Sequence, residues 1–246
     1  MNGERRGKAD LHIHSLASDG VSSVAQILDA AEGAALDVIA VTDHDRIEAA
    51  YACRTLAEER GSSVEVILGE EVSSRGGHVI ALFIEQRIRP WQSLRSTVAQ
   101  IHEQGGLAII AHPLVPYPLC ASGRTIRRLA ADAAPHLHPD GIEAFNPTTA
   151  RMAWSRKAPA LAAELGVAAL ASSDAHRADD IGTAFTTFSG STAEDLRAAI
   201  LAGTTEWQGT AYTWRAQVST FGQQMAKRGR LVRDSVRGAT VMRDRP

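Results

Sequence analysis

The chain has 246 residues, of which 44% are hydrophobic and 22% charged, and its formal net charge at pH 7 is −2. This length and composition suit one α/β barrel domain with a buried core, and the small net charge argues against a general nucleic-acid coat protein. Two lone cysteines, a short polar N-terminus and the absence of an apolar run of roughly 18 residues predict a cytoplasmic protein that does not enter a membrane.

Short apolar runs alternate with longer amphipathic stretches along residues 1–210. The continuous apolar run at 37–42 is typical of a strand that is buried on both faces. Helix boundaries are marked by Ser22 and Ser23 at one start, Gly61 at one end, and a capping box formed by Ser191 and Glu194. The predicted strands are 9–14, 37–42, 64–69, 78–84, 107–111, 141–145 and 167–171. The predicted helices are 22–35, 47–60, 91–104, 125–134, 149–165 and 191–202. Repeated strand–helix units of this length indicate a parallel sheet, open or closed.

Histidines and carboxylates gather at the ends of the predicted strands. His12 and His14 are two residues apart on one strand, so both imidazoles face the same side. In a parallel barrel the carboxyl ends of the strands meet at one face, where catalytic groups lie. His78 begins its strand, so it reaches that face only if the strand runs antiparallel to its neighbours. The other residues at strand ends or in the following loops are Asp19, His44, Glu71, His112, Asp174 and His176.

Imidazole and carboxylate ligands without thiolate favour Zn²⁺, Mn²⁺ or Fe²⁺ over Ca²⁺. Nine such side chains are more than one ion needs, and they match two or three divalent ions. A site of this charge would bind phosphate and lower the pKa of a water molecule to near neutral. The pattern therefore predicts metal-dependent chemistry on a phosphorylated substrate.

Other residues near these motifs have simpler interpretations. His136 and His138 repeat the two-residue spacing, but they lie in a loop flanked by prolines, and we expect a structural or exposed role. His102 lies inside a predicted helix, and we do not expect it to bind metal. Asp43 and Asp45 flank His44, and they either orient imidazoles or cap loops.

The motifs resemble those of the PHP family, named for polymerase and histidinol phosphatase. They are DLHIHSLASDG (10–20), VTDHD (41–45), GEEVS (69–73), GGHVIALF (76–83), AHP (111–113), GIEAFNP (141–147) and SSDAH (172–176). The resemblance implies a distorted (β/α)7 TIM-like barrel over residues 1–210, a trinuclear metal site and phosphoester hydrolysis. The opening motif is most similar to the branch with nucleoside 3′,5′-bisphosphate phosphatases, whose helical insert between His78 and His112 this chain lacks. The implied metal ligands are His12, His14, Asp19, His44, Glu71, His78, His112, Asp174 and His176.

The resulting hypothesis is hydrolysis of a phosphate monoester, from a nucleotide or a small phosphorylated metabolite, by a metal-activated hydroxide. Asp19, His44 and His176 are the candidate catalytic residues, and Arg75, Arg124 and Arg177 are the candidate phosphate-binding residues. One alternative is a 5′–3′ exonuclease or phosphodiesterase on short nucleic acid. Another is an amidohydrolase-type enzyme, although none of the three lysines ends a predicted core strand. A third is a metal-stabilised regulatory module without turnover.

Residues 211–246 differ in charge from the rest of the chain, with eight basic and two acidic residues. Apolar residues recur there at mostly helical spacing between the basic ones, which predicts a basic amphipathic helical tail. The tail either packs its apolar stripe on the barrel or helps to hold an anionic substrate or a second subunit.

Overall fold

The computed structural model describes residues 5–213 of the chain, as nine strands and six helices with three short 3-10 turns. The strands are β1 (Arg6–Ile13), β2 (Val38–Val41), β3 (Glu65–Ser74), β4 (Gly77–Leu82), β5 (Leu107–Ile110), β6 (Gly141–Phe145), β7 (Ala168–Ala171), β8 (Ala184–Ser189) and β9 (Glu206–Gly209). The helices are α1 (Val24–Gly33), α2 (Glu48–Arg60), α3 (Leu94–Glu103), α4 (Gly123–Ala130), α5 (Ala158–Leu165) and α6 (Ala193–Ala202). The 3-10 turns are η1 (Pro135–Leu137), η2 (Ser155–Lys157) and η3 (Ala178–Asp180).

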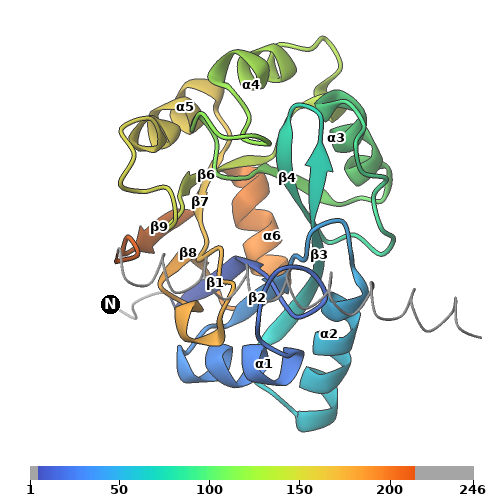
Figure 1. The fold of residues 1–246 in the computed structure, drawn as a ribbon, viewed down its shortest axis with the longest axis vertical. Helices are drawn as coiled ribbons and strands as arrows, with labels where there is room; N and C mark the ends of the chain where they lie inside the picture. The colour runs from blue at the N-terminus through green and yellow to red at the C-terminus, as the bar shows by residue number, and fades with distance from the viewer. Residues whose placement is uncertain (1–4, 214–246) are drawn as a thin grey trace, which may run out of the picture. The chain divides into compact units, whose positions relative to one another are not determined.

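The strands form one mixed sheet in the order β7-β6-β5-β4-β3-β2-β1-β8-β9, which curls into a nearly closed barrel (Figure 1). Strands β1, β2 and β3 are parallel, as are β5, β6 and β7, whereas β4 is antiparallel to both of its neighbours. The end of β1 meets the segment after β7, where the His14 amide donates to the Ala175 carbonyl at 2.8 Å. The expected distorted TIM-like barrel is confirmed, with β8 and β9 as an antiparallel extension beside β1.

Two apolar layers hold the barrel together. The outer layer packs α1, α2, α3 and α5 against the outward residues of the strands, such as Ile39, Val66 and Ile110. The inner layer includes Leu11, Ile67 and the α6 residues Leu196 and Ile200. Helix α6 contacts β3, β7 and β8, so it fills the interior at the amino ends of the parallel strands (Figure 1). The interior at the opposite, carboxyl end is therefore left for polar side chains.

Several predicted helix bounds differ from the structure. Helix α3 begins at Leu94 rather than at 91, and α4 spans Gly123–Ala130 rather than 125–134. The helix expected at 149–165 begins only at Ala158, because Asn146 and Ser155 bond the backbone of the preceding segment in turns and Pro159 favours a helix start. The capping box of α6 is formed by Thr192 and Asp195, one residue after the expected pair.

Strands β8 and β9 were absent from the sequence prediction. Among the described residues, no helix is both long and apolar enough to cross a bilayer. The predicted basic tail lies outside the described residues from position 214 onward, so its helix and its role stay predictions.

Candidate metal centre

The structure brings all nine predicted ligands together at the carboxyl ends of the parallel strands. His12 lies on β1 and His14 follows it, while Glu71 lies on β3 beside His44, with which it forms an isolated bridge. His78 is at the start of β4, and because β4 runs antiparallel, that start lies at the same end. Four groups have potential ligand atoms within 4.8 Å of one another: His12, His14 and Glu71; His12, His112 and Asp174; His14, Asp19 and His176; His44, Glu71 and His78.

Glu71 occupies the centre of the cluster. Its Oε2 lies 3.2 Å from His12 Nε2, 3.4 Å from His14 Nε2 and 3.0 Å from His44 Nδ1. Its Oε1 lies 2.8 Å from His78 Nδ1 and 2.9 Å from His112 Nε2. One carboxylate thus faces five imidazoles and belongs to two of the four ligand groups.

Two aspartates complete the cluster on the side of His176. Asp174 Oδ1 lies 3.3 Å from His14 Nε2 and 3.5 Å from His12 Nε2. Asp19 Oδ1 lies 3.2 Å from His176 Nε2 and 3.6 Å from His14 Nδ1. Two ligand atoms of one tetrahedral zinc ion, each about 2.1 Å from it, are about 3.4 Å apart. The observed separations match that spacing.

Several buried imidazole nitrogens in the cluster have no partner in hydrogen-bond geometry, although Glu71 oxygens lie 2.8–3.4 Å from four of them. They are His12 Nε2, His14 Nε2, His44 Nδ1 and both ring nitrogens of His78. Buried polar atoms are nearly always hydrogen bonded, so such a concentration needs an explanation. Six imidazoles stand in contact here, with ring centroids 4.2–5.8 Å apart along the cluster. Metal ions, which bind imidazole lone pairs, fit this donor set.

The neighbouring imidazoles favour the ionised form of the carboxylates, which is the form that binds cations. Burial alone would raise the pKa of Glu71, but His44, His78 and His12 around it hold that pKa well below its ordinary value. Burial also opposes ionisation of Asp174, and His12 and His14 outweigh it and lower the pKa. Burial disfavours the charged form of His44, yet Glu71 raises its pKa to about 9. Cations must displace imidazole protons, so metal binding is favoured as the pH rises.

The comparisons with known proteins agree with this geometry. The family model described as "PHP domain" matches residues 10–119, and the model "PHP-associated" matches residues 153–205. The "Uncharacterized protein MJ1587" of Methanocaldococcus jannaschii is 35% identical over 150 residues, which are 56% of this chain and 81% of that protein. The chain belongs to the PHP family. It is a metal-dependent phosphoesterase, a hydrolase of phosphoric ester bonds.

Other similar proteins share shorter segments or the fold. A 5′-3′ exoribonuclease of Haemophilus influenzae is 32% identical over 106 residues, which are 42% of this chain and 38% of that protein. A two-domain protein from Bacteroides vulgatus, described as containing a predicted PHP-like metal-dependent phosphoesterase, superimposes with a TM-score of 0.70. It is 18% identical, and the match covers 91% of this chain and 71% of that one.

Two residues that contact the PHP cluster had no role in the sequence prediction. Glu143 Oε1 lies 2.9 Å from His12 Nδ1, and its Oε2 accepts from the His112 amide at 2.6 Å. Asn146 Nδ2 donates to Glu143 at 3.2 Å and to Asp174 at 3.1 Å. These contacts orient ligand side chains. A buried acid inside the apolar run 141–145 was the signal that could have revealed Glu143.

The two aspartates that flank His44 hold loops around the cluster. Asp43 Oδ1 accepts from the amides of Ser15 at 2.8 Å and Ser18 at 3.1 Å, in the loop that leads to Asp19. Asp45 Oδ1 accepts from the Ser73 amide at 2.8 Å. Of the two interpretations left open by the sequence, these contacts favour loop capping.

The three remaining histidines belong to none of the ligand groups found in residues 5–213. His102 on α3 bonds Asp140 through Nε2 at 2.8 Å and the His136 carbonyl through Nδ1 at 2.6 Å. His138 Nε2 bonds the Asp132 carbonyl at 2.8 Å. The His102 contacts tie helix α3 to the η1 segment, and the His138 contact lies within segment 132–138.

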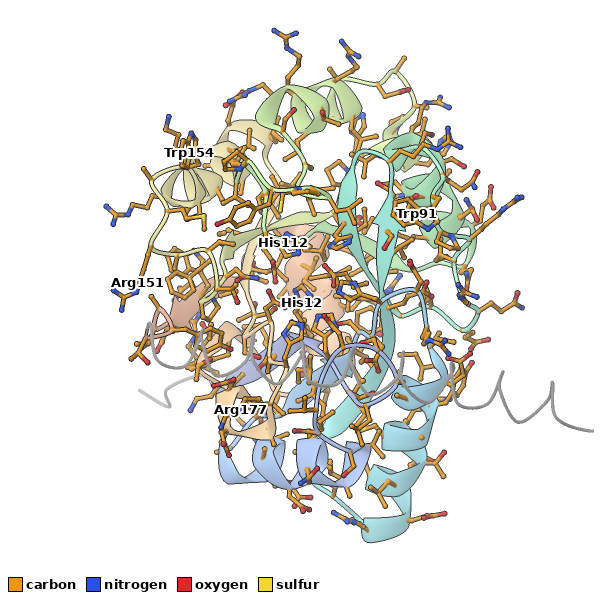
Figure 2. All side chains as sticks on the ribbon, in the orientation of Figure 1. His12, Trp91, His112, Arg151, Trp154 and Arg177 are labelled. Carbon is orange, nitrogen blue, oxygen red and sulfur yellow. The ribbon has the colours of Figure 1, made fainter. Side chains whose placement is uncertain are left out.

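The three arginines proposed to bind phosphate lie in loops and on a helix around the cluster. Arg75, in the β3–β4 turn, is exposed and donates from Nε to the Trp91 carbonyl at 2.7 Å. Arg124 is exposed in the first turn of α4. Arg177 directly follows His176 and pairs with Asp179. In Figure 2, Arg177 lies at the periphery, whereas His12 and His112 lie near the centre.

Proposed function

We propose that this PHP protein hydrolyses phosphate monoesters, of a nucleotide or another small phosphorylated metabolite, at the centre around Glu71. The observation that carries the proposal is that three of the four ligand groups share no residue and together include all nine side chains. They are His12, His112 and Asp174; His14, Asp19 and His176; and His44, Glu71 and His78. Three protein ligands per ion, with a position left for water or substrate, are typical of catalytic metal sites.

This division supports three divalent ions rather than one. Imidazole and carboxylate donors suit Mn²⁺, Fe²⁺ or Zn²⁺. When bound, such ions polarise phosphoryl oxygens and lower the pKa of water to near neutral. Three divalent ions would outweigh the three carboxylates of the groups, so the loaded centre would attract a phosphate dianion.

The candidate catalytic residues are the three most exposed of the nine side chains, although His112, at 13%, is nearly as exposed as His176. The side chains of His44, Asp19 and His176 are 30%, 19% and 14% exposed, whereas those of His12 and His14 are fully buried. A group that gives a proton to the leaving oxygen must contact the substrate. We therefore assign proton transfer to Asp19, His44 or His176, and phosphate binding to Arg75, Arg124 or Arg177.

A second candidate is phosphodiester cleavage, as a 5′–3′ exonuclease on short nucleic acid. It is favoured by the activities of two similar proteins, the exoribonuclease and a phosphoribosyl 1,2-cyclic phosphate 1,2-diphosphodiesterase of Eggerthella lenta. The latter is 36% identical over 83 residues, which are 31% of this chain and 31% of that protein.

A substrate comparison on Mn²⁺-loaded protein tests both candidates. The panel holds p-nitrophenyl phosphate, bis-p-nitrophenyl phosphate, mononucleotides and 5′-phosphorylated oligonucleotides. We expect monoester hydrolysis that Asp174→Asn lowers by about 100-fold or more, and that His102→Ala leaves unchanged. Turnover of diesters alone would replace the first candidate by the second, and no turnover of any of the four classes would refute both.

A further inference from the structure

His112 is held in an unusual conformation at the end of β5. Its backbone φ is 25°, in the left-handed region that non-glycine residues seldom adopt, so the surrounding contacts must fix it. The amide donates to Glu143 at 2.6 Å, and Nε2 points to Glu71 Oε1 at 2.9 Å. The other ring nitrogen, Nδ1, lies 3.2 Å from the sulfur of Cys120.

The ring nitrogens determine which atom can bind a metal ion. An imidazole that binds an ion through Nε2 keeps its proton on Nδ1, and that proton is normally donated to a neighbouring acceptor. Two other imidazoles of the cluster follow this pattern. His12 Nδ1 faces the Glu143 carboxylate at 2.9 Å, and His176 Nδ1 faces the Asp174 carbonyl at 3.0 Å. His112 differs in that the atom facing its Nδ1 is a thiol sulfur.

The loop that carries Cys120 is fixed by backbone contacts of its own. The Leu119 carbonyl accepts from the His78 amide at 2.7 Å, and the Ala121 carbonyl accepts from the Leu114 amide at 2.9 Å. Gly77 packs so closely on this loop that an added Cβ would lie 2.7 Å from the Ala121 Cβ. The backbone on both sides of Cys120 is therefore fixed without the His112 contact, and the same loop contacts two of the proposed ligands, His78 and His112.

We propose that Cys120 is a positioning residue of the metal centre, whose sulfur accepts the hydrogen bond from His112 Nδ1–H. This bond holds the ring rotation and the tautomer that present the Nε2 lone pair toward Glu71. The inference rests on the proposed function, because it assumes that Nε2 binds an ion. Loss of such an oriented partner typically costs 10–100-fold in metal affinity.

The test uses three substitutions at Cys120 and one matched control. Cys120→Ser keeps a side chain that accepts a hydrogen bond, Cys120→Ala removes it, and Cys120→Val removes it while filling the space against water. The control is Cys53→Ala, which removes the buried thiol of α2. For the full-length protein and each variant, competition with a chelator gives the Zn²⁺ and Mn²⁺ affinity, and thermal melting without metal reports the fold.

We expect Cys120→Ala and Cys120→Val to weaken metal binding by about tenfold or more at an unchanged metal-free melting temperature. Cys120→Ser should stay within about threefold of wild type, and Cys53→Ala should bind metal like wild type. In Zn²⁺-loaded protein, long-range ¹H–¹⁵N spectra should place the His112 proton on Nδ1.

Wild-type affinity in both Cys120→Ala and Cys120→Val would overturn the positioning role. An affinity loss in Cys120→Ser equal to that in Cys120→Ala would also overturn it. If either overturning result is obtained and the wild-type protein still hydrolyses p-nitrophenyl phosphate, the role of Cys120 is refuted and the proposed function is not. If the wild-type protein binds no metal, the proposed function fails with it.

Discussion

Glu70 and Glu71 are neighbours on β3 with opposite environments. Because side chains alternate along a strand, Glu71 faces the imidazoles inside the barrel and Glu70 faces outward. Glu70 Oε2 accepts from the Ile88 amide at 3.1 Å, while its buried Oε1 has no hydrogen-bond partner. Burial raises the pKa of Glu70 to about 8, whereas the pKa of Glu71 is held low. Glu71 is therefore suited to binding cations, whereas ionisation of the buried Glu70 destabilises the fold as the pH rises.

Removing a central imidazole should stop catalysis without unfolding the chain. His14→Ala is expected to lower bound metal and to reduce phosphatase activity by about 100-fold or more, because His14 lies in two of the ligand groups. Metal analysis and circular dichroism measure the two effects. His136→Ala is the control, since its imidazole lies outside those groups, and should retain activity within about tenfold. Full activity in His14→Ala would contradict the assignment of the centre.

The raised pKa of Glu70 predicts a pH-dependent stability. A carboxyl with a folded-state pKa above its unfolded value stabilises the fold at low pH, and this contribution is lost as the pH rises from about 4.5 to about 8. Glu70→Gln cannot ionise, so its melting temperature should exceed that of wild type by about 3 °C or more at pH 8.5 and show a smaller difference at pH 5.

Metal-free protein is used for this comparison, so that binding at the neighbouring Glu71 does not contribute. Glu85→Gln, at an exposed position, should melt like wild type at both pH values. A difference in melting temperature between Glu70→Gln and wild type that stays constant across this pH range would disprove the effect.

The direction of strand β4 and the position of helix α6 determine where the site lies in the barrel. Strand β4 runs against both neighbours, and this reversal puts its first residues, with His78, at the carboxyl ends of the parallel strands. A bulge in β1 between Asp10 and Ile13 shifts the register ahead of His14. Helix α6 fills the opposite end of the interior with Leu196 and Ile200. The barrel therefore has one apolar end and one polar end.

Helix α6 should matter for stability and not for metal binding. Leu196 is fully buried, so Leu196→Ala should lower the free energy of unfolding by about 2–5 kcal/mol. Urea denaturation measures this change. Leu201→Ala on the same helix, where the side chain is 60% exposed, should change it by less than about 0.5 kcal/mol. The folded Leu196→Ala protein should bind as much metal as wild type, and a selective loss of metal would show that α6 also shapes the centre.

At the scale of the whole molecule, the metal centre joins distant parts of the chain. Its ligands come from β1, β3, β4 and from the segments that follow β1, β2, β5 and β7. In metal-free protein these segments bring together imidazoles that carry raised pKa values, among them His12, His44 and His112. Ions that bind only the folded arrangement must therefore stabilise the entire barrel.

Removal of metal should lower both activity and melting temperature. At a free ion concentration of about 100 times the dissociation constant, binding contributes about 2.7 kcal/mol, or about 5–10 °C in melting temperature. Dialysis against a chelator followed by differential scanning calorimetry measures the loss. Mn²⁺ or Zn²⁺ should restore both properties, whereas Ca²⁺, which prefers oxygen ligands, should restore neither. Equal melting temperatures with and without Mn²⁺ would argue against a metal centre.

The sequence by itself determined the barrel class, most strand positions and the choice of the nine clustered side chains. It could do so because burial on both faces leaves continuous apolar runs, and strand ends in such a barrel meet at one face. The roles of Glu143, Asn146 and Cys120 depended on tertiary structure, since each acts on a residue that is distant in sequence or on a ring nitrogen whose direction no local pattern fixes. Strand β9 and the late start of α5 were likewise decided by pairing with β8 and by side-chain bonds to the backbone, which outweigh local propensity.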